Sequence, residues 1–417
     1  MTGLHHQSLS VSETPRQDDA WSDTALEEAA LQKIIHLTER LLKVRPLGPE
    51  SRFIDLTSDI RKAFIFLREF QRRFEFDLPL SAFFDAPTLR DLAHVAVTGK
   101  TPPLSQLVLL RTGDRDIPPL FLMPGLGGVV FEVLELSKQL DYAGPIYAFA
   151  AAGLDGVDVP YTDTLLFSQQ NFSLARAAYP TGPYRFIGHS SGGVAAFEMT
   201  RCAGNSGVEV DFFGVLDTNF AERAWPLGIW LRHMLQRITQ SATEETGDNP
   251  VSARPTSEEV TGGRRLTDKL SGVVNKVANG VSRLKRKIDH RFFGDPTSEI
   301  FVKEDPYYIP NLPPKFQRVR DSAITMAVCY RPTYYDCDLF LFQAELGDAL
   351  ACDPVLTWSR FVRKIILRPT PGDHMTMLIQ PHVVKVAQEV SICLAEVENA
   401  RRQSISERLR DSAREAI

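Results

Sequence analysis

The sequence has no long hydrophobic run, no large excess of charge of one sign and few cysteines. Its apolar stretches are far shorter than the roughly 20 residues that a membrane-spanning helix needs. Residues 1–23 are polar and contain no apolar core of a secretion signal. The net charge of −5 leaves no basic excess for binding a nucleic acid. We therefore expect a cytoplasmic protein with no transmembrane segment and no nucleic-acid partner.

The scarce cysteines also exclude a disulfide framework, because they are odd in number and scattered along the chain. No two of them have the spacing of a metal or redox motif. They are Cys202, Cys329, Cys337, Cys352 and Cys393. We expect a reducing compartment and no metal site.

The composition of the sequence is that of a globular protein, with 43% hydrophobic and 24% charged residues. Its 417 residues are enough for more than one domain. The chain opens with a polar segment, 1–22, that we expect to be a disordered tail. Residues 23–98 then show helical patterns and predict a small helical unit, followed by a linker over 99–106 that contains Gly99 and two prolines.

Within the small unit, the first helix is predicted to begin at Thr24, which has capping-box spacing to Glu27. A second helix is predicted to begin near Ser58 or Asp59, and a short third one covers 88–97. The side chains expected to point inward from the second helix are Ala63, Phe64, Leu67, Phe70 and Phe74.

From residue 107 to about 396 the pattern changes to apolar strands that alternate with helices, which predicts an α/β fold with a mostly parallel sheet. The predicted strands are 107–110, 120–123, 146–149, 185–187, 212–216, 339–342 and 365–367. The predicted helices include 130–140, 164–178, 194–203 and 382–400. Residues 397–417 are expected to form a charged C-terminal tail.

A long insertion, about 220–325, interrupts this alternation and is predicted to be a mostly helical lid. Its part 264–291 reads as a basic amphipathic helix, and 315–329 as another helix. The apolar face could cover an apolar substrate and the basic face could meet an acidic partner. A plain solvated helix is the alternative.

Gly188-His189-Ser190-Ser191-Gly192 has the G-x-S-x-G pattern between a predicted strand and a predicted helix. That context is the one in which the pattern forms a nucleophile elbow, with the serine exposed at a sharp turn. We predict Ser190 as the nucleophile. The backbone N–H of Ser191 is the expected oxyanion donor, whereas His189 is expected to be structural.

Met123 to Gly128 forms a glycine-rich loop after a predicted strand, and such a loop can direct a second N–H at a developing oxyanion. Leu126 is the predicted donor. A flexible strand-to-helix turn is the alternative.

Asp217 follows the apolar run 212–216, and His374 lies in a glycine-containing loop after the last predicted strand. The order Ser190, Asp217, His374 is the one found in α/β-hydrolases, with the histidine as base and the aspartate as its orienting acid. Glu345 and Asp348 are alternative acids. Asp217 as a helix cap and His374 as a surface residue remain open.

Residues 105–395 resemble the thioesterase domains that end nonribosomal peptide and polyketide assembly lines. The resemblance is carried by Met-Pro-Gly-Leu-Gly-Gly at 123–128, the serine elbow, Leu-Asp-Thr at 216–218, Tyr-Arg-Pro at 330–332 and Gly-Asp-His at 372–374. It implies an α/β-hydrolase that releases an acyl or peptidyl group from a phosphopantetheine thioester by hydrolysis or cyclisation.

Residues 25–97 resemble a peptidyl or acyl carrier domain. The shared features are Phe-Ile-Asp-Leu at 53–56, Leu-Pro-Leu at 78–80, Phe-Phe at 83–84 and Pro-Thr-Leu at 87–89. In that family a serine four residues after the Asp-Leu leucine takes the cofactor, and here Ile60 occupies its place. The resemblance therefore implies a carrier-like bundle without bound cofactor. The substrate would arrive on a separate carrier protein or on coenzyme A.

Two other functions remain open. The same triad could serve an acyltransferase that passes the acyl group to an amine or alcohol. The chain could also be a non-catalytic docking protein.

Overall fold

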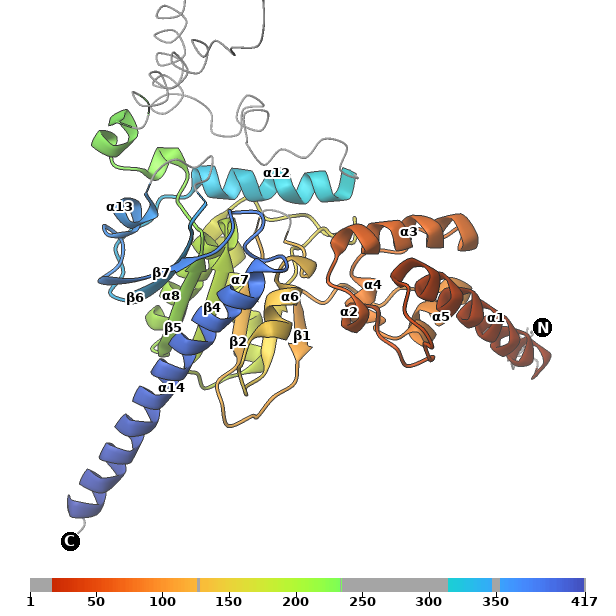
Figure 1. Cartoon of the computed structure of the whole chain (residues 1–417), viewed down its shortest axis with the longest axis horizontal. Helices are drawn as coiled ribbons and strands as arrows, with labels where there is room; N and C mark the ends of the chain where they lie inside the picture. The colour runs from red at the N-terminus through yellow and green to blue at the C-terminus, as the bar shows by residue number, and fades with distance from the viewer. Residues whose placement is uncertain (1–16, 126–127, 233, 235–313, 347–352, 416–417) are drawn as a thin grey trace, which may run out of the picture. The chain divides into compact units, whose positions relative to one another are not determined.

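The computed structural model describes residues 17–125, 128–232, 234, 314–346 and 353–415 (Figure 1). The chain divides into two compact units, Met1–Ser105 and Gln106–Ile417. The predicted oxyanion donor Leu126, the alternative acid Asp348 and the basic segment 264–291 lie outside the described residues.

The first unit is all helical. Its elements are α1 (Gln17–Leu42), α2 (Phe53–Leu56), α3 (Ile60–Phe74), α4 (Ala82–Asp85) and α5 (Leu89–Thr98). Asp59 caps α3 by accepting the N–H of Arg61, as expected for a helix that begins there. Thr88 and Asp91 form a reciprocal capping box at the start of α5.

The core of this unit is an aromatic cluster. Phe53 stacks on Phe83 with ring centroids 4.3 Å apart, and Phe66 lies 5.1 Å from Phe53 and 5.4 Å from Phe83. All three side chains are fully buried. Three large rings buried at one point contribute strongly to the apolar burial of so small a unit.

Two details of the helix prediction were wrong. The first helix begins at Gln17, so Thr24 lies inside α1 and residues 17–22 are helical rather than part of a tail. On α3 the buried side chains are Ala63, Phe66 and Phe70, whereas Phe64 is only partly buried. The inward face of α3 cannot be identified from the apolar pattern alone, because Ile65 is apolar like its neighbours and yet exposed.

The second unit is an α/β-hydrolase-type fold around a seven-stranded sheet with the order β1-β3-β2-β4-β5-β6-β7. The strands are β1 (Leu107–Arg111), β2 (Leu120–Met123), β3 (Ile146–Phe149), β4 (Tyr184–His189), β5 (Val210–Leu216), β6 (Asp338–Ala344) and β7 (Lys364–Thr370). Among the described strands β1 alone pairs antiparallel, with β3, and the remaining ladders are parallel. The mostly parallel sheet predicted from the sequence is therefore confirmed.

Helices cover both faces of this sheet (Figure 1). α6 (Phe131–Gln139) packs with α14 (His382–Glu415), and α7 (Thr164–Ala178) packs with α8 (Ser191–Asn205). Right-handed crossovers explain this division, because the chain moves outward from β2 to β3 and then reverses toward β4 and β5. Both faces of β2 and β4 are buried in consequence.

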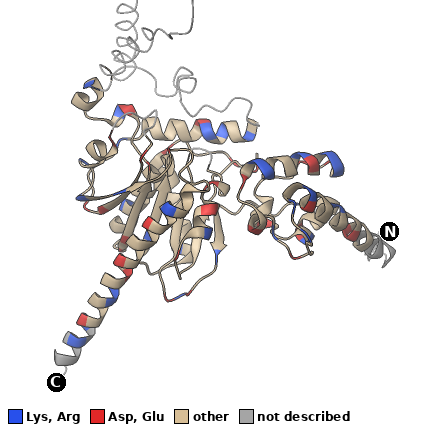
Figure 2. Ribbon diagram, viewed as in Figure 1, with Lys and Arg blue, Asp and Glu red and all other residues tan. Residues whose placement is uncertain are grey.

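The last helix, α14, is longer than the sequence predicts. It continues to Glu415, through the segment expected to be a tail. Its residues up to Leu394 include several fully buried side chains, whereas acidic and basic side chains line the part beyond (Figure 2).

A buried ion-pair network joins α14 to the sheet. The guanidinium of Arg185 on β4 is fully buried, and it donates to Asp211 at 2.7 and 2.8 Å and to Glu398 of α14 at 2.7 Å. Two carboxylates satisfy one buried cation, so neither side of the network is left uncompensated.

Of the predicted lid, the structure describes the short helix η1 (Glu222–Ala224) and α12 (Pro314–Cys329), which matches the helix predicted over 315–329. A last short helix, α13 (Pro354–Trp358), precedes β7. Among the described helices none is long and apolar enough to cross a membrane. Within the same residues no cluster of side chains is suited to hold a metal ion.

The aromatic cluster makes a stability prediction for the first unit. Phe66→Ala should destabilise that unit by about 3–5 kcal/mol, because it removes a fully buried ring and leaves a cavity. Amide hydrogen exchange of α3 and α5 in the full chain should then speed up.

The matched control is Ile65→Ala, the neighbouring residue on the same helix, whose side chain is 40% exposed. This substitution should change the amide exchange rates of α3 and α5 little. Equal acceleration in both variants would contradict the assigned core.

Candidate active site

The proposed nucleophile sits on a strained turn between β4 and α8. Ser190 has φ 54° and ψ −130°, a region that side-chain-bearing residues rarely adopt. Backbone hydrogen bonds hold this conformation: its N–H donates to Leu216 O at 3.2 Å, and its carbonyl accepts the N–H of Gly193 at 3.0 Å. The serine is thereby held, partly buried, at the tip of the turn.

The glycines on either side permit this close packing. A Cβ at Gly188 would lie 2.2 Å from the carbonyl oxygen of Gly192. A Cβ at Gly192 would lie 2.3 Å from the carbonyl oxygen of Pro124, in the glycine-rich loop. Both distances are below any real contact, so the elbow and the loop can touch only where the side chain is absent.

The structure brings Ser190, His374 and Asp217 into one hydrogen-bonded chain. His374 Nε2 lies 3.0 Å from Ser190 Oγ, and His374 Nδ1 lies 2.8 Å from Asp217 Oδ2. The imidazole of His374 is almost fully buried, with 3% of the residue exposed. The three side chains therefore have the geometry that acyl transfer by a serine requires.

Asp217 is held at the end of β5 by the neighbouring strand. Its N–H donates to Phe342 O at 2.8 Å, and its Oδ1 accepts the N–H of Ala344 at 3.2 Å. Its φ of 42° is also in the left-handed region. One carboxylate oxygen is anchored to β6 while the other faces His374. Glu345, the alternative acid, is exposed.

The described oxyanion candidate is Ser191, the first residue of α8. Its N–H belongs to the free donors at a helix N-terminus, where the helix dipole also favours negative charge. In the glycine-rich loop, Gly125 directs its own N–H at Glu132 Oε1, 2.8 Å away.

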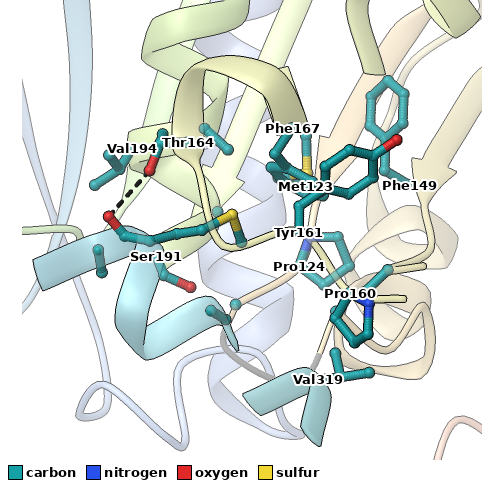
Figure 3. A pocket seen from close by; sticks show the side chains of 18 of the residues that line it. Met123, Pro124, Phe149, Pro160, Tyr161, Thr164, Phe167, Ser191, Val194 and Val319 are labelled. Carbon is teal, nitrogen blue, oxygen red and sulfur yellow. Dashed lines mark hydrogen bonds between the residues drawn. The ribbon is translucent and has the colours of Figure 1, made fainter. Parts of the chain in front are cut away.

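A mostly apolar pocket opens beside the elbow (Figure 3). Its walls come from the glycine-rich loop, the segment after β3, α7, the start of α8 and one face of α12. The residues labelled in Figure 3 are Met123, Pro124, Phe149, Pro160, Tyr161, Thr164, Phe167, Ser191, Val194 and Val319. Thr164 donates its hydroxyl to Met326 O at 3.0 Å, which ties α7 to α12 at the pocket wall. Such a lining suits an apolar group.

Sequence reasoning missed Glu132, which lies in the first turn of α6 and contacts His189. Oε1 of Glu132 is 2.5 Å from His189 Nδ1, and His189 Nε2 is 3.1 Å from the carbonyl oxygen of His374. Burial disfavours a charged His189, but the Glu132 carboxylate outweighs it and raises the pKa of His189. The only signal in the sequence was an acidic residue inside an otherwise apolar helix start.

Comparison with known families agrees with this geometry. Residues 118–244 match the thioesterase domain family, and residues 32–96 match the family described as the phosphopantetheine attachment site. The central part of the chain is thus similar to a thioesterase domain. Ser190 and Asp217 fall inside the matched residues, and His374 follows them in the same unit.

The relatives of this chain are much larger synthetases. Indigoidine synthase of Dickeya dadantii is 28% identical over 166 residues, which is 40% of this chain and 11% of that protein. The synthetase btyA of Aspergillus terreus is 26% identical over 226 residues, 46% of this chain and 24% of that protein. The chain therefore spans a small part of these relatives' length.

Among solved structures, the four-domain nonribosomal peptide synthetase AB3403 aligns with 94% of this chain and 27% of its own, at 19% identity and a TM-score of 0.48. The Vlm2 thioesterase domain aligns with 69% of this chain and 97% of its own, at 20% identity and a TM-score of 0.42.

The close packing at the elbow of the second unit predicts the effect of one substitution there. Gly192→Ala should destabilise this unit by about 1–3 kcal/mol, because the new methyl group collides with the carbonyls of Met123 and Pro124. The measurement is the melting temperature of the full chain. Gly228→Ala, where nothing lies within 4 Å of the added Cβ, is the control and should not lower it. An unchanged melting temperature in Gly192→Ala would refute the assigned packing.

Proposed function

We propose that the second unit is a serine thioesterase that releases an acyl or peptidyl group through an acyl-Ser190 intermediate. The observation that carries the proposal is the chain of two hydrogen bonds from Ser190 Oγ through His374 to Asp217, at 3.0 and 2.8 Å. The nonribosomal peptide synthetases among the relatives support the peptidyl or acyl class of substrate.

In the first half-reaction, His374 Nε2 accepts the proton of Ser190 Oγ as the oxygen attacks the thioester carbonyl. Asp217 accepts a hydrogen bond from Nδ1–H and stabilises the imidazolium that forms. The oxyanion accepts hydrogen bonds from the N–H of Ser191 and from a second N–H of the glycine-rich loop, where Leu126 is the predicted donor. Collapse of the intermediate expels the thiolate, which takes the proton from His374.

In the second half-reaction, a nucleophile attacks the acyl-Ser190 ester with His374 again as base. Water gives hydrolysis, and a hydroxyl or amine of the acyl group itself gives cyclisation. The apolar pocket beside Ser191 is where we place the acyl group. An acyltransferase would use the same steps with an external amine or alcohol. Mass spectrometry of the products, with and without such acceptors, separates the three reactions.

The first prediction of this mechanism concerns the triad. Ser190→Ala and His374→Ala should each reduce thioester turnover on the order of 10⁴- to 10⁶-fold, and Asp217→Asn should reduce it severely but less than Ser190→Ala. A fluorophosphonate probe should label wild type and not Ser190→Ala.

Glu345→Gln is the matched control for the carboxylate and should keep near-wild-type turnover. Full activity in Asp217→Asn together with loss in Glu345→Gln would transfer the orienting role to Glu345. Absence of probe labelling in wild type would favour the non-catalytic docking protein.

We further propose that the carrier-like first unit bears no phosphopantetheine, although its residues 32–96 match the attachment family. Attachment needs a hydroxyl at the start of the second main helix, where the helix N-terminus favours a phosphate. Ile60, the first residue of α3, has none. The substrate would then arrive on a separate carrier protein or on coenzyme A.

The test is incubation of the full chain with coenzyme A and a broad phosphopantetheinyl transferase, followed by intact mass measurement. Wild type should gain no phosphopantetheine. Ile60→Ser is the matched variant and should gain one if the bundle is otherwise recognised. A mass gain in wild type that maps to Thr57 or Ser58 would contradict the proposal.

A further inference from the structure

Glu132 and His189 form a hydrogen-bonded pair beside His374 that the mechanism above does not use. His189 precedes the nucleophile and is 6% exposed, and the Glu132 side chain is 27% exposed. The rings of His189 and His374 are 4.9 Å apart between centroids. The pair therefore contacts the loop that carries His374.

The hydrogen-bond partners determine the protonation of His189. Its Nε2 faces the carbonyl oxygen of His374 at 3.1 Å, and a carbonyl only accepts, so Nε2 carries a proton. Its Nδ1 faces Glu132 Oε1, an oxygen that already accepts the N–H of Gly125. A carboxylate oxygen accepts here too, so Nδ1 also donates. Two donating nitrogens make His189 an imidazolium.

The same two side chains reach three separate segments of the site. His189 belongs to the elbow and is bonded directly to Ser190. Glu132 accepts from Gly125 in the glycine-rich loop. His189 donates to the backbone of His374 in the loop that carries the base. The nucleophile, the oxyanion loop and the base therefore share one buried, charge-assisted network.

We propose that Glu132 and protonated His189 form a positioning pair. The pair fixes the positions of these three segments relative to one another for the reaction at Ser190. The inference rests on the proposed serine thioesterase function. Neither side chain touches the reacting atoms, and each acts through the backbone of the residues that do. Small displacements of a nucleophile, base or oxyanion donor are costly, because the reacting geometry tolerates little error.

The pair also predicts a pH dependence. The groups that face His189 are Glu132 from α6, Asp217 after β5 and His374 after β7. Loss of the Nδ1 proton at alkaline pH leaves a lone pair opposite the Glu132 carboxylate, and the pair is broken. Because Glu132 raises the pKa of His189 above its usual value, the pair is intact below that raised pKa and kcat falls as the pH rises through it.

The key variant is Glu132→Gln, which keeps the shape and removes the charge. We expect kcat on a small soluble thioester to fall by about 10- to 100-fold with KM nearly unchanged. The alkaline fall of kcat should disappear from the assay range, because His189 without its carboxylate is already neutral there. The matched control is Glu135→Gln on the same helix, an exposed contact to Gln139 and Gln380, which should behave as wild type.

A second measurement does not depend on catalysis. In the full chain labelled with ¹⁵N-histidine, NMR at neutral pH should show both ring nitrogens of His189 protonated in wild type and one in Glu132→Gln. A neutral His189 in wild type overturns the proposal. Equal kcat and equal pH profiles for the two glutamate variants also overturn it. If the fluorophosphonate fails to label Ser190 while the NMR result holds, the failure belongs to the proposed function instead.

Discussion

Parallel strand pairing is the constraint on which the site depends. Because β4, β5, β6 and β7 run in the same direction, their carboxyl ends meet at one edge of the sheet. His189 is in register with Leu216, and Leu216 with Phe342. The residues that follow β4 and β5, Ser190 and Asp217, therefore emerge side by side. Chemistry-bearing residues far apart in sequence become neighbours without any direct attraction between them.

Strain is concentrated at this edge. Ser190 and Asp217 both have positive φ, and each is held by a backbone hydrogen bond to the adjacent strand, to Leu216 O and Phe342 O. The surrounding ladders over-determine the two turns, so an unfavourable backbone conformation of about 1–3 kcal/mol per residue can persist there. The two strained residues are the proposed nucleophile and the proposed orienting acid. Rigidity of the sheet thus places both groups before a substrate arrives.

Much of this arrangement could be predicted from the sequence, because the strands are short, apolar and bounded by helices. β2, β3 and α7 have the predicted bounds, and the residues of the triad were named from their places after strands. What could not be predicted is tertiary. The inward face of α3 was misread because Phe64, Ile65 and Phe66 are all apolar. Glu132 was missed because its partner His189 is distant in sequence, and no local pattern marks a carboxylate that meets a ring only after the sheet has formed.

The buried guanidinium of Arg185 has a consequence for the order of folding. Its two carboxylate partners lie on β5 and near the end of the unit, at Glu398. During synthesis Asp211 can pair with Arg185 as soon as β5 is made, but Glu398 is made much later, so the three-residue network is complete only when α14 is present. The central sheet therefore reaches its final packing only after α14 is released. Until then the apolar side chains that α14 shares with the core, such as Val383, Val386 and Val390, have no surface to pack against, and incompletely folded domains of this kind are prone to aggregate.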